Sequence, residues 1–140
     1  MANEITFQAY LQIAKDGQVI YMSPNQSFLV DMTGKKGPAP GAITVPVDGV
    51  LIPLTAFTVP GVGEIRNLDI TNYIEVGLSD GVEFYPMLEV GPEEHYPIKL
   101  SRNILKAYGT GSGTGTLDSL NLWARAYGGA CEAVFAFFER

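Results

Sequence analysis

The sequence predicts an all-β protein built as an antiparallel sandwich or barrel of about eight to ten short strands. Short apolar-rich runs are separated by turn residues roughly every eight to twelve positions. Several of these runs alternate apolar and polar side chains with the period of a half-buried strand. No long helical pattern separates them, so a doubly wound fold of alternating strands and helices is not expected.

The first strand is expected at residues 5–13, where odd-numbered positions are apolar and even-numbered positions carry Thr, Gln or Tyr. This alternation predicts a strand with one face buried. Asp16-Gly17 follows, and this pair favours a tight hairpin turn because glycine accepts a positive φ without steric cost. Residues 18–23 then form the returning strand, and residues 27–32 resume extended structure.

The next segment, at about 34–62, is rich in proline. Residues 34–41 form a loop rich in Gly and Pro, and Pro46, Pro53 and Pro60 interrupt the apolar run that follows. Since proline donates no hydrogen bond to a sheet, we expect edge strands, bulges or an extended arm here. The region at about 34–62 is either an arm that lies against a neighbouring subunit or an irregular connection within one subunit.

The second half of the chain is more regular. Ser79-Asp80-Gly81 predicts a hairpin between residues 73–78 and 82–88, and a turn at residues 91–94 precedes another strand. If the hairpin has that register, Glu75 and Glu83 lie side by side on an outward face. Solvated surface charge is then their expected role, and the alternative is a carboxylate pair for glycoside chemistry.

The end of the chain is expected to be a second hairpin. Residues 120–127 alternate, Gly128-Gly129 suits a two-residue turn, and residues 130–139 return. A helix over residues 130–138 is the rival interpretation because its apolar residues also fit helical spacing. Residues 109–116, of low complexity, predict a flexible Gly/Thr loop. The 140 residues therefore form a single β-sandwich domain.

Charge excludes several partners. The formal net charge is −6, and the basic residues are scattered apart from Lys35-Lys36. A nucleic-acid or anionic membrane surface needs clustered basic residues, so neither is an expected partner. No apolar stretch reaches the roughly 18 residues that span a bilayer, and no secretory signal is recognised at the N-terminus, so synthesis in a cytoplasm is expected.

No catalytic, cofactor-binding or metal site is expected, and the protein is predicted not to be an enzyme. His95 is the only histidine, and adjacent Glu93 and Glu94 point in alternate directions on an extended chain. Ser112 lacks the Gly-x-Ser-x-Gly spacing, and the glycine-rich loop lacks a phosphate-binding ending. Cys131 lies in an apolar run, where a buried inert thiol is expected.

Outward-facing aromatic residues are the candidate interface. Aromatic rings with a polar tip are favoured at protein interfaces and at sugar-binding faces. Coverage of the second sheet of the sandwich is the structural alternative, and sugar binding is the third. The candidates are Tyr73, Tyr85, Tyr96, Trp123 and Tyr127.

Residues 64–138 resemble small structural proteins of tailed bacteriophage virions. The resemblance is carried by the run from Leu68 to Gly77, by Phe84-Tyr85-Pro86, by the Gly91-Pro92-Glu93 turn and by Lys99-Leu100-Ser101. A loop of small residues, Gly, Ser and Thr then precedes the last two strands. The first sixty residues contribute little to it.

This resemblance implies a jelly-roll-like β-sandwich with no catalytic residues. It implies a virion protein, made in the host cytoplasm and placed on the head surface, that decorates or cements the capsid. The expected partners are the major capsid protein or other virion subunits, with a homo-oligomer, favoured as a trimer. A neck or tail structural protein, or a carbohydrate- or receptor-binding β-sandwich, is the alternative.

Overall fold

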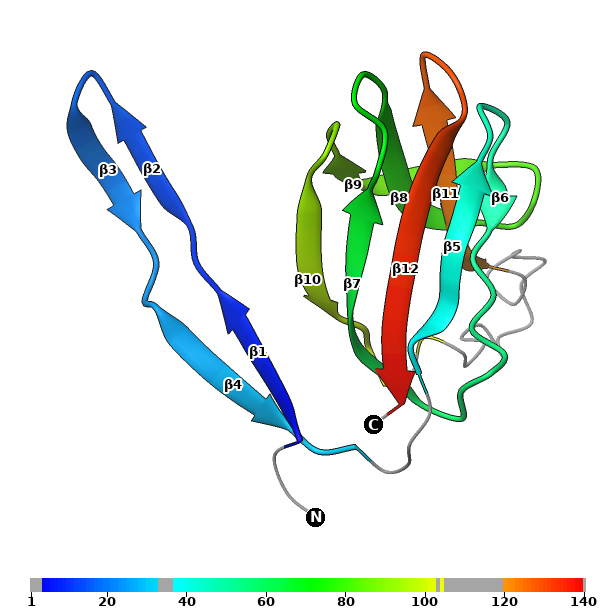
Figure 1. The fold of residues 1–140 in the computed structure, drawn as a ribbon, viewed down its shortest axis with the longest axis horizontal. Helices are drawn as coiled ribbons and strands as arrows, with labels where there is room; N and C mark the ends of the chain where they lie inside the picture. Colours follow the sequence, from blue (N-terminus) through cyan, green and yellow to red (C-terminus); the bar gives the residue numbers. More distant parts are fainter. Residues whose placement is uncertain (1–3, 33–36, 103, 105–119, 140) are drawn as a thin grey trace, which may run out of the picture.

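The computed structural model describes residues 4–32, 37–102, 104 and 120–139. Figure 1 shows two parts, a long ribbon-like arm and a β-sandwich. No helix occurs in these ranges, and the fold is the predicted all-β sandwich. The arm consists of four strands: β1 (Ile5–Ala9), β2 (Gln12–Lys15), β3 (Gln18–Met22) and β4 (Gln26–Val30).

The sandwich contains eight strands in two antiparallel sheets of four, within the described part of the chain. The first sheet has the order β10-β7-β12-β5, and the second has the order β6-β11-β8-β9. The strands are β5 (Ala39–Val45), β6 (Val50–Leu51), β7 (Pro60–Asn67), β8 (Tyr73–Ser79), β9 (Phe84–Val90), β10 (His95–Lys99), β11 (Asn121–Tyr127) and β12 (Cys131–Glu139).

The strand pairs of the sandwich are nested. β5 pairs with β12 and β6 pairs with β11, while β7 pairs with β10 and β8 pairs with β9. The first strand therefore lies beside the last, the second beside the second last, and so on inward to one hairpin. That central hairpin turns at Ser79-Asp80-Gly81, as the sequence predicts.

Alternating side chains from both sheets fill the space between them. Ile65 and Phe135 face inward from the first sheet, and Ile74, Val76 and Ala124 face inward from the second. Phe135 and Phe137 are the largest side chains with no solvent exposure. Cys131 is also fully buried, and this burial raises the pKa of its thiol above the usual cysteine value.

The predicted hairpin at the end of the chain is wrong, although both strands exist and the helical alternative is excluded. β11 belongs to the second sheet and β12 to the first, so the turn at Gly128-Gly129 crosses from one layer to the other. Asn72 explains why glycine is needed there. A Cβ on Gly128, whose φ is 89°, would lie 2.3 Å from the Asn72 Oδ1.

The proline-rich segment forms edges of the sandwich. β5 is an edge strand of the first sheet, and β6, of two residues, is an edge strand of the second. Pro46 lies just beyond β5, where its carbonyl accepts a hydrogen bond from the Ala126 N–H at 3.1 Å. The Gly/Thr loop predicted at 109–116 lies outside the described residues.

Three carboxylates hold turns between strands. Asp69 accepts backbone hydrogen bonds from Thr71 and Asn72, and Asp80 accepts them from Val82 and Glu83. Glu94 accepts a hydrogen bond from the Tyr96 hydroxyl and another from the Gly91 N–H. These hydrogen bonds favour the charged form and lower the pKa of all three carboxyl groups.

Replacing Phe135 by alanine is expected to destabilise the sandwich by about 3–5 kcal/mol, because it removes a buried ring and leaves a cavity. Val82→Ala is the matched control, since Val82 is 88% exposed. Urea unfolding followed by circular dichroism measures both variants. Equal midpoints for the two variants would contradict this packing.

Stability is expected to fall in acid. Because the three pKa values are lowered on folding, the contribution of these carboxylates is complete at neutral pH. It is lost progressively as the pH falls below about 4 and through the lowered values. Thermal unfolding between neutral pH and pH 2 measures this loss. The double variant Asp69→Asn, Asp80→Asn should show a shallower loss, and an unchanged slope would refute the assignment.

Candidate interaction surfaces

The N-terminal arm, residues 4–32, is a β-ribbon that leaves the sandwich. β1 pairs with β4 and β2 pairs with β3, and the ribbon turns at Asp16-Gly17. Asp16 and Gly17 have φ values of 51° and 78°, the positive values that a primed hairpin turn requires. The predicted hairpin is confirmed. At about 3.3 Å per residue, a ribbon running from residue 5 to residue 16 spans roughly 40 Å.

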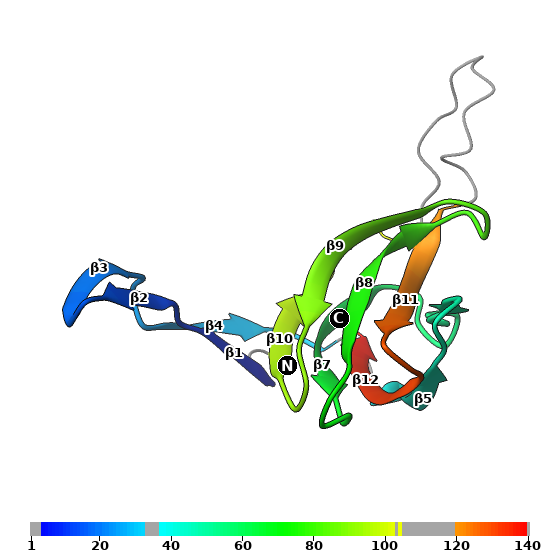
Figure 2. The ribbon, with the colours of Figure 1, turned by 90° about the horizontal axis from the view of Figure 1, so that it is seen from above.

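The prediction that this first strand is half-buried holds only at its start. Ile5 and Phe7 are partly buried at the base of the arm, but the apolar positions from Ala9 to Ile13 are exposed to solvent instead of lying in the core. Figures 1 and 2 show the distal half of the arm, with β2 and β3, standing clear of the sandwich. Its exposed large apolar residues are Tyr10, Leu11, Ile13, Val19, Ile20, Tyr21 and Met22, and Ile20 is 63% exposed.

The base of the arm is attached to the sandwich. Across the ribbon, Phe7 lies opposite Phe28 with their ring centroids 6.5 Å apart. Phe7 and its neighbours in β1 line a groove together with residues of the first sheet, including Gly63, Pro97 and Phe138. The arm is therefore fixed at one end, and its distal half has no contact that buries its apolar residues.

Soluble monomers rarely leave a large contiguous apolar surface in water, so the arm is a candidate contact surface.

The outer face of the second sheet carries an aromatic cluster. Tyr73 on β8 lies opposite Tyr127 on β11, and their rings stack with centroids 4.9 Å apart and planes 6° apart. The Arg125 guanidinium lies 4.8 Å from the Phe84 ring centroid and 4.9 Å from that of Tyr127. It also donates a hydrogen bond to the Tyr127 hydroxyl. These cation–π contacts hold Arg125 flat against the sheet.

Two polar features distinguish this aromatic cluster. Burial raises the pKa of Tyr127, and a hydrogen bond and repulsion involving Glu75 raise it further. Nε of Arg125 is buried and has no hydrogen-bond partner among the described residues. Leaving a buried donor without an acceptor costs stability.

The structure brings together three of the five aromatic residues that the sequence singles out. Tyr73, Tyr127 and Trp123 share the outer face of the second sheet, where Trp123 lies beside Gly49 and Gly81. Tyr85 lies on β9, at the edge of that sheet. Tyr96 lies on β10 of the other sheet, where its hydroxyl donates to Glu94 at 2.8 Å. The five residues therefore do not form one surface.

The hairpin register differs from the expected one at Glu75. The residue opposite Glu75 on β9 is Glu89, and Glu83 lies in the turn before β9. On the other side, Arg125 lies opposite Glu75, with its Nη2 3.9 Å from the Glu75 Oε1. The paired strands begin only at Ser79 and Phe84, so residues 80–83 form the turn, and a β-bulge after Val76 shifts the pairing by one further residue.

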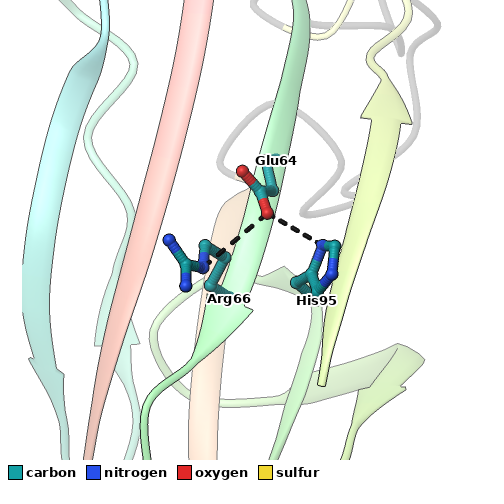
Figure 3. Close-up of polar contacts among 3 residues, drawn as sticks. All are labelled: Glu64, Arg66 and His95. Atoms are coloured by element: carbon teal, nitrogen blue, oxygen red, sulfur yellow. Dashed lines mark ion pairs between the residues drawn. The ribbon is translucent and has the colours of Figure 1, made fainter. Parts of the chain in front are cut away.

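His95 lies in a small exposed polar group on the first sheet. Its Nδ1 is 2.9 Å from Glu64 Oε1, and Arg66 Nε lies 3.7 Å from the same oxygen (Figure 3). Among the described residues, no group of three or more His, Cys, Asp or Glu side chains is placed to hold a metal ion. Over the same residues, no helix has the length and apolar character needed to cross a membrane.

No protein-family model, curated protein or solved structure matches this chain.

The double variant Ile20→Lys, Met22→Lys is expected to reduce the binding of an apolar dye such as ANS without unfolding the protein. Both side chains are exposed, so the free energy of unfolding should change by less than about 0.5 kcal/mol. Ile70→Lys, at a 77% exposed position outside the arm, is the matched control. Unchanged dye fluorescence in the arm variant would mean that the arm presents no contiguous apolar surface.

Proposed function

We propose that this chain is a structural subunit of a tailed-bacteriophage virion, and that it decorates the outer surface of the head. It acts by protein–protein contacts with the major capsid protein and with other copies of itself. The observation that carries the proposal is the arm, because its distal half presents exposed apolar side chains of the kind that a protein partner covers.

The strand order supports a jelly-roll form for the sandwich. Eight strands in two sheets, paired first with last and then inward, are what a long hairpin rolled into two layers produces. This agrees with the resemblance of residues 64–138 to small virion proteins. The formal net charge of −6 suits a position on the outside of the shell, away from packaged DNA.

Binding to shells tests the proposal. Purified heads of the phage that encodes the chain, stripped of accessory proteins, are incubated with it and sedimented. The chain is expected to sediment with the heads and to raise the temperature at which they disrupt, since many weak contacts add over a shell. The Ile20→Lys, Met22→Lys variant should bind less, and Ile70→Lys should bind normally.

The proposal fails if the chain stays in the supernatant and the heads disrupt at an unchanged temperature. Binding to isolated tails in place of heads would assign the protein to the neck or tail, the alternative position within the particle.

Sugar binding is a second candidate, favoured by one pocket on the second sheet. Trp123 lines this pocket of about 230 Å³ together with Asp48, Ser79, Glu83 and Arg125. A flat aromatic ring with carboxylate and guanidinium groups around it is a common setting for a sugar. Trp123 is the only tryptophan, so its fluorescence reports on this pocket directly. An unchanged emission spectrum across a glycan panel would eliminate this candidate.

A further inference from the structure

An apolar cleft opens between the two sheets beside edge strands β9 and β10. It has a volume of about 360 Å³, more than twice the roughly 150 Å³ of a cavity that holds benzene. Apolar side chains of both sheets line it, among them Leu78, Met87, Leu88, Ile98 and Leu122. Met87 is 71% exposed, so the cleft is accessible from solvent along this edge.

The distal half of the arm, residues 10–23, matches this cleft in chemistry. It carries two charged residues, Lys15 and Asp16, both next to its turn, and its remaining surface is uncharged. Among the residues that line the cleft, Lys99 is the only charged one. The charges of Lys15 and Asp16 cancel at the tip, so an apolar ribbon without net charge meets an apolar cleft with one basic residue, and no net repulsion opposes their contact.

The edge strands offer a second kind of contact. β9 and β10 are the outer strands of their sheets, and each has one side without a neighbouring strand in the described fold. Unpaired backbone groups at such edges accept a further strand from another chain. The arm is already extended and hydrogen-bonded as a ribbon, so binding would require little additional ordering.

The arm cannot fill the cleft of its own sandwich. Its base lies against the first sheet, and its distal half points away from the sandwich in both views (Figures 1 and 2). We propose that apolar side chains on the distal half of the arm of one copy dock into the interlayer cleft of a second copy. This deepens the proposed function, on which its biological role rests, by naming the partner of the arm.

Arm-to-cleft docking has a direct consequence for symmetry. The contact joins two different surfaces, so it is heterologous, and each copy offers one arm and one cleft. Repeating such a contact generates either a closed ring or an open chain. A closed trimer is the ring that the sequence resemblance favours.

The test uses two single variants of the full chain and light scattering over a range of concentrations. Wild-type protein should self-associate. Ile20→Lys, which alters the arm, and Met87→Glu, which alters the cleft, should each weaken association by about thirtyfold or more, because an unpaired charge is buried at the contact. Ile70→Lys should associate like the wild type.

Mixing the two variants is the decisive step. The arm bearing Ile20→Lys then meets the cleft bearing Met87→Glu, while the unaltered arm meets the unaltered cleft. Association should therefore return in the mixture as particles that contain both variants, at least as mixed pairs, because a ring of three copies always keeps altered contacts. Circular dichroism confirms that each variant is folded, and both positions are exposed in the free chain.

Three results overturn the proposal. A wild-type chain that stays monomeric at every concentration excludes self-docking. Loss with Ile20→Lys but not with Met87→Glu indicates that arms pair with arms. A mixture that stays monomeric after each variant alone has lost association excludes the arm-to-cleft contact. Shell binding is measured separately, so a chain that self-associates but ignores shells overturns the proposed function alone.

Discussion

A two-stranded ribbon cannot bury its own faces. The apolar side chains of the arm therefore need another surface to cover them. The arm is roughly 40 Å long, and its distal half stands clear of the packed sandwich and presents apolar side chains to solvent. Isolated hairpins are only marginally stable in water, and their apolar faces favour association. The state of lowest free energy for this chain is therefore expected to be one in which another protein covers the arm.

The sandwich provides the rigid body from which the arm extends. β5, the first strand after the arm, pairs with β12, the last strand of the sandwich. Both strands therefore belong to the first sheet. The buried side chains of Phe135 and Phe137 pack between the two sheets. The second sheet directs its stacked tyrosines and Arg125 outward, away from the core, which leaves a separate face for other contacts.

Local patterns in the sequence predict the elements well. Asp16-Gly17 and Ser79-Asp80-Gly81 are correct hairpin turns, because the backbone conformation of a short turn depends on the residues within it. Proline correctly indicates the edge strands β5 and β6. The strand at 131–139 is also correct, despite a competing helical spacing.

Contacts between residues that are distant in sequence cannot be predicted in this way. Gly128-Gly129 marks a turn, but its residues do not determine whether the chain stays in one sheet or crosses to the other. Alternation at residues 5–13 shows that one face is apolar, but not whether the same chain covers it. Tyr73 and Tyr127 meet through the pairing of β8 and β11, which are distant in sequence.

The central claim is that protein covers the distal arm in the assembled state. Introducing Ile20→Cys and following its reaction with a soluble maleimide tests this directly, since Cys131 is buried and should react slowly. Rapid labelling in dilute solution and strong protection in the assembled form is the predicted result. Equal labelling rates in the two states would show that the arm stays in solvent and would contradict the account.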